Sequence, residues 1–187
     1  MIQSIADFCP RGAESGVGLA LQDDAGCYLF FLAGKGLDCP PGERFFAGIG
    51  GHREADEDWL ACAQREVLEE VGTNVEVLSA PITWYIPQAG PARRVELSDR
   101  PRPLALYEMI HPLGTPRAGG TYRIVVYQAR LCGLPGNLQE DEVLALIALT
   151  REQVIRGPER KPALAELLEE GARIVASEGQ VDPQIRL

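Results

Sequence analysis

The stretch "GHREADEDWLACAQREVLEEVG", residues 51–72, is the most informative part of the sequence for the fold. It holds seven carboxylates and two arginines, and three of the carboxylates, Glu66, Glu69 and Glu70, lie close together. At about 100° per residue these three fall on one side of a helix. The apolar residues form a separate arc suited to core packing: Leu60, Ala63, Val67 and Val71. Acids at this spacing destabilise a bare helix by roughly 0.2–0.5 kcal/mol per pair, so their clustering needs an explanation.

The residues flanking this segment predict where the helix begins and ends. Asp56 is a good N-cap, and the acids just inside it suit the positive end of a helix. Gly72 fits the left-handed position that follows a last helical turn. Residues 44–49 are expected to form a short strand before the loop, so the segment is predicted to run from strand through loop to helix.

The spacing of the fixed residues resembles the Nudix box, Gly-x5-Glu-x7-Arg-Glu-aliphatic-x-Glu-Glu-x-Gly-aliphatic. Every fixed glycine and polar position is filled: Gly51, Glu57, Arg65, Glu66, Glu69, Glu70 and Gly72. The single departure is Thr73 at the terminal aliphatic position, which concerns packing rather than chemistry. A solvated acidic face is the simpler explanation of a charge cluster. Fixed residues at defined spacing, in a strand-loop-helix context, favour the resemblance over that explanation.

The resemblance implies a hydrolase that cleaves nucleoside diphosphates linked to another moiety, with a divalent cation. A diphosphate repels water or hydroxide, and hard cations held by carboxylates both neutralise its oxygens and polarise a water. Carried over by position, Glu66, Glu69 and Glu70 are the metal ligands, and the backbone carbonyl of Gly50 is a further one. The expected cation is Mg²⁺, with Mn²⁺ as the alternative.

The remaining polar positions of the box have supporting roles in the same resemblance. Glu57 and Arg65 are expected to pair and to orient the metal ligands, although an ordinary surface ion pair, worth under about 1 kcal/mol, would look the same in sequence. Glu66 is our first candidate for the general base. The run Gln139-Glu140-Asp141-Glu142 precedes an apolar strand, where related domains often place another acid. Any of its three acids could reach the site, and Glu142 is favoured among them because it directly adjoins the strand. A solvated turn is the alternative of equal weight.

Substrate recognition is predicted from the longest segment without an assigned element, residues 87–103. It holds four arginines that could clamp a phosphate or stack on a base: Arg93, Arg94, Arg100 and Arg102. For each of them taken singly, solvation of the loop is an alternative of at least equal weight. The loop is long enough to cover a second moiety of the substrate. This length favours a nucleoside diphosphate derivative, such as ADP-ribose or a sugar nucleotide. The alternatives are a nucleoside triphosphate pyrophosphatase and a non-catalytic ligand-sensing module; retention of every box acid favours an enzyme.

Composition limits the remaining classes of function. The 187 residues are 45% hydrophobic and 24% charged, which suits one globular domain. A net charge of -9 argues against nucleic-acid binding through a basic face. Apolar runs are too short to cross a bilayer, so a cytoplasmic protein without membrane contact is expected. Five scattered cysteines and two distant histidines, His52 and His111, suggest neither a disulfide framework nor an imidazole metal cluster.

The expected fold is a Nudix-type α/β/α sandwich around a mixed β-sheet, formed by residues 1–187 as one domain. The predicted strands are 16–22, 26–32, 44–49, 74–80, 82–86, 104–110, 121–131 and 143–149. A short N-terminal segment, about 1–14, precedes them. Helices are expected at 151–156 and, as an amphipathic C-terminal helix, at about 162–176. The apolar strand 104–110 could form the edge of a homodimer.

Overall fold

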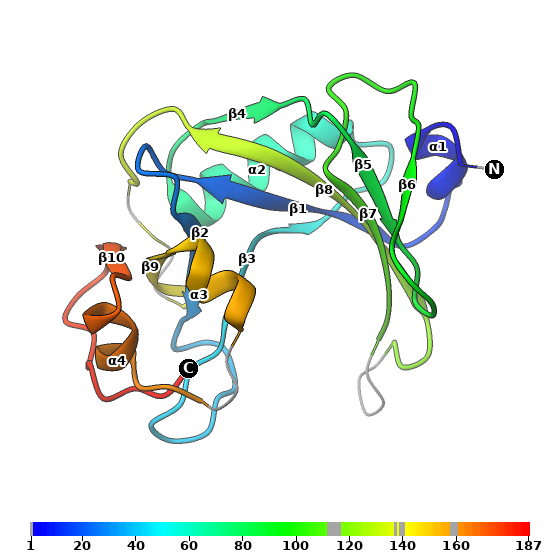
Figure 1. The fold of residues 1–187 in the computed structure, drawn as a ribbon. Coiled ribbons are helices and arrows are strands. Elements are labelled where there is room, and N and C mark those ends of the chain that lie inside the picture. The colour runs from blue at the N-terminus through cyan, green and yellow to red at the C-terminus, as the bar shows by residue number, and fades with distance from the viewer. Residues whose placement is uncertain (1, 112–116, 137, 139–140, 158–160) are drawn as a thin grey trace. The chain divides into compact units, whose positions relative to one another are not determined.

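The computed structural model describes residues 2–111, 117–136, 138, 141–157 and 161–187 (Figure 1). The chain divides into two compact units, each assembled from three segments. The first unit comprises Met1–Leu19, Gly50–Gln64 and Val77–Ala129. The second unit comprises Ala20–Ile49, Arg65–Glu76 and Arg130–Leu187.

Short strands outnumber helices in the described residues (Figure 1). The strands are β1 (Ser15–Gln22), β2 (Tyr28–Ala33), β3 (Phe46–His52), β4 (Val75–Leu78), β5 (Thr83–Ile86), β6 (Arg93–Val95), β7 (Ala105–Ile110), β8 (Thr121–Leu131), β9 (Val143–Leu149) and β10 (Arg173–Ser177). The helices are α1 (Ile5–Phe8), α2 (Trp59–Val71), α3 (Arg151–Arg156) and α4 (Leu164–Glu169). None of these helices is long and apolar enough to span a membrane.

In the first unit, the strand pairings are both parallel and antiparallel. β7 pairs antiparallel with β8, with Glu108 opposite Arg123. On its other side β7 pairs in parallel with β5, which in turn pairs antiparallel with β6. Because β7 has a strand on each side, the expectation that residues 104–110 offer an edge for a homodimer is wrong. Val125 and Tyr127 on β8 are both fully buried. They are two residues apart, and side chains at this spacing lie on the same face of a strand. The predicted mixed α/β fold with a mixed sheet is therefore confirmed.

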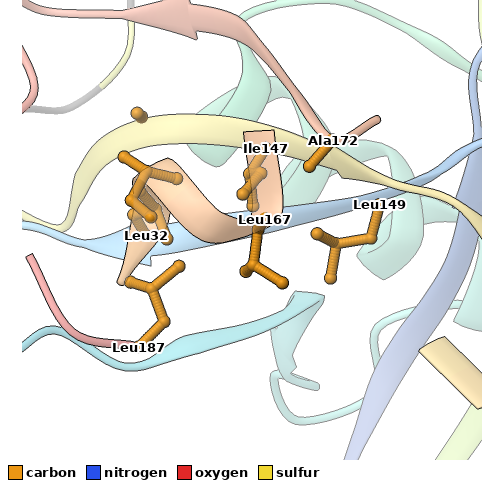
Figure 2. Close-up of a cluster of buried hydrophobic side chains, with 8 residues drawn as sticks. Leu32, Ile147, Leu149, Leu167, Ala172 and Leu187 are labelled. Atoms are coloured by element: carbon orange, nitrogen blue, oxygen red, sulfur yellow. The ribbon is translucent and has the colours of Figure 1, made fainter. Parts of the chain in front are cut away.

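The second unit is built around β9, whose residues are almost all buried. β9 pairs antiparallel with β2 on one side and with β10 on the other, and β2 continues to β3. An apolar cluster packs α4 and the chain terminus onto these strands, as Figure 2 shows. Its buried members are Leu32, Ala145, Ile147, Leu149, Leu164, Leu167, Ala172 and Leu187. Burying side chains of this kind is worth about 1.5–3 kcal/mol for each large one.

The C-terminal segment was predicted as one helix over 162–176, and only the first half of this prediction is confirmed. α4 ends at Glu169, and Gly171 adopts φ +103°, a conformation that favours glycine. The next residues form β10, where Ile174 lies opposite Ile147 of β9. The β-branched Ile174 and Val175 suit an extended strand better than a helix, so the apolar spacing of this segment belongs to two short elements.

The N-terminal segment forms the short helix α1, which the sequence prediction missed. Ser4 and Asp7 make a reciprocal capping box, with the Asp7 N–H donating to the Ser4 hydroxyl at 3.1 Å. The N–H groups of Gln3 and Ser4 donate to the Asp7 carboxylate. Ile5 and Phe8 are buried, so α1 is attached by its apolar side.

Candidate functional site

The loop before α2 is arranged differently from the prediction, which placed the helix cap at Asp56. α2 begins at Trp59, and the Asp58 carboxylate accepts the N–H of Leu60 at 2.9 Å and of Ala61 at 3.3 Å. Asp58 is therefore the N-cap. Asp56 has φ +61°, a left-handed conformation that an N-cap does not adopt. Two acids two residues apart look equivalent as caps in sequence, and the turn at residues 55–56 decides between them.

Two of the three predicted metal ligands on α2 share one arginine. Nη1 of Arg65 lies 2.7 Å from Oε1 of Glu66 and 3.2 Å from Oε2 of Glu69. The Glu66 side chain is only 11% exposed, whereas that of Glu69 is 46% exposed. A carboxylate as buried as Glu66 needs a partner of opposite charge, and Arg65 provides it. Glu70, one residue further along the same helix, is half-buried.

Glu57 fastens the loop that leads into α2. Its carboxylate accepts the backbone N–H of Glu54 at 3.0 Å. Its carbonyl accepts a hydrogen bond from Nε of Arg53 at 2.6 Å. The predicted pairing of Glu57 with Arg65 stays a prediction.

Gly50 lies inside strand β3 rather than in a turn. Its φ is +139°, and a Cβ at this position would lie 2.2 Å from the carbonyl oxygen of Val17. Only glycine fits such a close approach of two backbones. The proposed role of the Gly50 carbonyl as a metal ligand is compatible with this packing but does not follow from it.

The side chains on α2 fit a divalent cation by donor type. Carboxylate oxygens are the hard ligands that Mg²⁺ and Mn²⁺ prefer, and Glu66, Glu69 and Glu70 supply them from one helix. Within the described ranges, no three His, Cys, Asp or Glu side chains converge closely enough to hold an ion. Binding by these glutamates therefore requires Glu66 or Glu69 to turn from Arg65 toward the cation.

The acidic run before β9 is only partly within the described residues, because Gln139 and Glu140 lie outside them. Glu142 is exposed in a turn, and its carbonyl accepts the N–H of Gly34 at 2.8 Å. The carbonyl of Asp141 accepts the N–H of Gly36 at 2.7 Å. These two bonds fix the backbone of the turn and leave the Glu142 side chain on the surface, where its role as a second base stays a prediction.

The predicted recognition loop contains a strand. Arg93 and Arg94 lie in β6, whose residues face Tyr85 and Trp84 of β5. The guanidinium of Arg93 lies 4.9 Å from the Tyr85 ring centroid, and that of Arg94 lies 5.4 Å from the Trp84 ring centroid. Both pairs are cation–π contacts, so these arginines already have aromatic partners.

Arg100 and Arg102, the other two predicted recognition residues, bond to nearby backbone. Nη1 of Arg100 donates to the carbonyl of Asp99 at 2.7 Å and to that of Leu97 at 3.2 Å. Nη1 of Arg102 donates to the carbonyl of Pro81 at 2.8 Å. These contacts stabilise the loop, and substrate binding by the two side chains stays a prediction.

The first unit contains a cluster of polar and aromatic side chains whose contacts were not predicted from the sequence. Nε2 of His111 lies 3.1 Å from Oε2 of Glu14, and Nε2 of His52 lies 3.4 Å from Oε1 of the same carboxylate. Both imidazoles stack on Tyr122, with ring centroids 4.7 Å away for His52 and 5.5 Å for His111. Arg117 also pairs with Glu14. The two histidines lie 59 positions apart in the chain, and no local motif signals their meeting.

The charged partners of this cluster act on the Glu14 carboxyl. Partial burial raises its pKa, but hydrogen bonds from His111 and Arg117 outweigh that effect and hold the pKa below its ordinary value. The Tyr122 hydroxyl donates to the carbonyl of Gly51 at 3.4 Å, at the start of the predicted box. The cluster therefore places the Glu14 carboxylate, held in its charged form, beside the loop that begins the box.

The NUDIX domain family model matches residues 14–170. The chain belongs to the Nudix family. This result confirms the resemblance of residues 51–73 and, with it, the prediction of a hydrolase. Nudix hydrolases act on small molecules and generally use divalent metal ions. No curated protein matches the sequence.

Two solved structures show the same fold at low sequence identity. The MutT protein from Methanosarcina mazei Go1 is 13% identical, with a TM-score of 0.52 over 80% of this chain and 85% of its own. A NUDIX hydrolase from Nitrosomonas europaea is 14% identical, with a TM-score of 0.52 over 84% of this chain and 87% of its own. At this identity the likeness establishes the Nudix fold and not the substrate.

Proposed function

We propose that this Nudix hydrolase cleaves the diphosphate linkage of a nucleoside diphosphate derivative, such as ADP-ribose or a sugar nucleotide, in a reaction that requires Mg²⁺. The observation that carries the proposal is the acidic segment of α2. Glu66, Glu69 and Glu70 are all retained on one helix, and Arg65 contacts two of them. Acids at this spacing repel one another, so their clustering on α2 favours a ligand of opposite charge.

In the proposed mechanism, the glutamates of α2 hold the cation, with Mn²⁺ as the alternative to Mg²⁺. When bound, the cation neutralises the diphosphate oxygens and lowers the pKa of a coordinated water. Glu66 accepts the proton of the attacking water, and Glu142 is the second candidate for this role. Arg65 contacts both Glu66 and Glu69, and cation binding would need one of the two carboxylates to turn from it.

The substrate side of the proposal rests on the arginines of residues 87–103. Arg93 and Arg94 are the best placed of the four, because each guanidinium lies against an aromatic ring and keeps a second planar face. A planar guanidinium can stack on a base or pair with a phosphate. Arg100 and Arg102 support this segment through their bonds to backbone carbonyls.

A substrate panel with Mg²⁺ tests the proposed reaction. Phosphate and nucleotide release is followed from ADP-ribose, sugar nucleotides, dinucleoside polyphosphates and nucleoside triphosphates. We expect the highest kcat/KM for a nucleoside diphosphate derivative. A strict preference for triphosphates would exclude our substrate class in favour of a triphosphate pyrophosphatase. Absence of turnover on every compound would favour a ligand-sensing module.

Replacing Glu69 by Gln tests the role of the acidic segment. The change keeps size and hydrogen bonding but removes charge from a proposed metal ligand, so we expect turnover to fall by orders of magnitude. Without metal, the melting temperature should change little, because Glu69 is 46% exposed and an exposed ion pair is worth under about 1 kcal/mol. Mg²⁺ should raise the melting temperature of the wild type more than that of the variant.

The same measurements on Glu76→Gln provide the control, because Glu76 is an exposed acid on β4 outside the box. This variant should keep both activity and the Mg²⁺-induced shift. If Glu69→Gln also keeps both in full, the acids of α2 form only a solvated surface.

A further inference from the structure

A pocket of 560 Å³ lies in the first unit, between the N-terminal segment and the loop before α2. Its volume is within the range of small-molecule sites, about 300–1,000 Å³. Small residues, among them Ala6, Gly12, Ala13 and Ala55, leave the space open. The acidic segment of α2 that we propose for catalysis does not line it.

Both walls of the pocket are fixed by hydrogen bonds that do not involve a ligand. On the N-terminal side, the N–H of Ile5 donates to the Asp99 carboxylate at 3.0 Å, and the N–H of Ser98 donates to the carbonyl of Gln3 at 2.9 Å. On the loop side, the N–H of Arg53 donates to the carbonyl of Ser15 at 2.9 Å. The space is therefore formed in advance, which reduces the entropy cost of binding.

The lining of the pocket carries hydrogen-bond donors from both of its walls. Ser15 is only 5% exposed and brings a hydroxyl group to the pocket lining. Arg53 uses Nε for the carbonyl of Glu57. Arg11 contributes a second guanidinium, paired with Asp56 at 3.5 Å. The donors of the two guanidinium groups suit a ligand rich in acceptors, such as a phosphate, and Glu54 and Asp56 of the same lining balance their charge.

A planar group is favoured by the geometry of Arg53. Its guanidinium carbon lies 4.5 Å from the ring centroid of Trp59, so one face of the guanidinium is stacked on the indole. The opposite face can stack on a nucleobase, as guanidinium planes do. Glu54 and Asp56 line the same pocket and can accept hydrogen bonds from amino and hydroxyl groups.

We propose that this pocket binds a nucleoside monophosphate, with its base against Arg53 and its phosphate bound by Arg11 and Ser15. The site is distinct from the acidic segment of α2. Because the Arg53 side chain also holds the carbonyl of Glu57, occupation of the pocket would change the loop that begins the Nudix box. The ligand is thus suited to regulate the hydrolase.

Trp59 fluorescence provides a direct readout. The chain has two tryptophans, Trp59 in the pocket and Trp84 on β5, so a Trp84→Phe background leaves one reporter. The full chain in EDTA, without divalent cation, is titrated with AMP, adenosine and ribose 5-phosphate. We expect saturable quenching by AMP, with affinity at least about 10-fold above either fragment. Equal affinity for ribose 5-phosphate would overturn the assignment of a base, and no saturable quenching would overturn the site.

Variants locate the binding. Arg53→Gln and Arg11→Gln should each weaken AMP binding about 10-fold, and Ala13→Leu should abolish it by filling the pocket. Arg11 is 89% exposed, so its replacement should preserve the fold even if Arg53→Gln does not. Arg130→Gln removes an equal charge from an exposed position on β8 and should leave binding unchanged.

Two outcomes with these variants would overturn the proposal. One is unchanged AMP affinity in Arg11→Gln and Ala13→Leu. The other is loss of AMP binding in Glu69→Gln, which would place the nucleotide at the acidic segment of α2. Failure of the proposed hydrolysis in the substrate panel would not affect this result, because the titration is made without metal and without turnover.

Discussion

At the scale of single residues, the packing and conformation of the backbone require a glycine at the position of Gly50. A Cβ there would lie 2.2 Å from the Val17 carbonyl oxygen, and φ is +139°. We expect Gly50→Ala to reduce the free energy of unfolding by at least about 2 kcal/mol, because strain and steric overlap add. Urea denaturation of the metal-free protein measures the loss.

Gly48, two residues earlier on the same strand, is the matched control. A Cβ at Gly48 would have no described atom within 4 Å, and its φ is not left-handed. Gly48→Ala should therefore change the free energy of unfolding by less than about 1 kcal/mol. Equal losses in the two variants would show that the close approach of Val17 does not explain the glycine.

The residue types of the candidate site could be predicted from the sequence, but the contacts between their side chains could not. The spacing of Glu57, Arg65 and the following acids led to the correct family, because chemistry fixes which residue types stand at which intervals. The preference of Arg65 for Glu66 and Glu69 depends on side-chain rotamers and on the burial of Glu66. The meeting of His52 with His111 depends on tertiary structure, which leaves no local pattern.

At the scale of elements, the start of α2 distinguishes two acids that look alike in sequence. The Asp58 carboxylate accepts two backbone N–H groups, so Asp58→Ala should reduce the free energy of unfolding by about 1 kcal/mol. Asp56 has φ +61°, and Asp56→Gly should change that free energy by less than about 0.5 kcal/mol, because relief of strain offsets the added chain entropy. Chemical denaturation of both variants gives the comparison.

The opposite result, a larger loss for Asp56→Gly than for Asp58→Ala, would support the original prediction that the helix begins at Asp56. Asp56 also pairs with Arg11, but both side chains are more than three-quarters exposed. Such a pair contributes little, so it should not hide the difference between the two caps.

Elements with a long and uniform pattern were predicted well, and short ones were not. The strands 121–131 and 143–149 match β8 and β9, because their apolar residues suit a buried sheet. α1 and β6 are only four and three residues long, too short for a periodic signal. The C-terminal helix was too long in the prediction because an apolar spacing continued through Gly171 into β10.

At the scale of the whole molecule, one domain was predicted from the sequence, and in the structure the chain divides into two compact units. The chain passes between the units five times, at residues 19–20, 49–50, 64–65, 76–77 and 129–130. Each passage falls inside a regular element: β1, β3, α2, β4 and β8. No passage resembles the flexible polar linker that usually separates domains.

This placement predicts that the two units unfold together. Melting either unit alone would break five continuous elements and interrupt the hydrogen bonds of the part that stayed folded, which makes a half-folded state costly. Differential scanning calorimetry of the metal-free protein should show one transition, with a calorimetric enthalpy equal to the van't Hoff enthalpy. Two transitions, or a calorimetric enthalpy well above the van't Hoff value, would show that the units are separate domains. In that case Gly50 and Glu57 would unfold with one transition and Glu66, Glu69 and Glu70 with the other, because the units divide the box between Gln64 and Arg65.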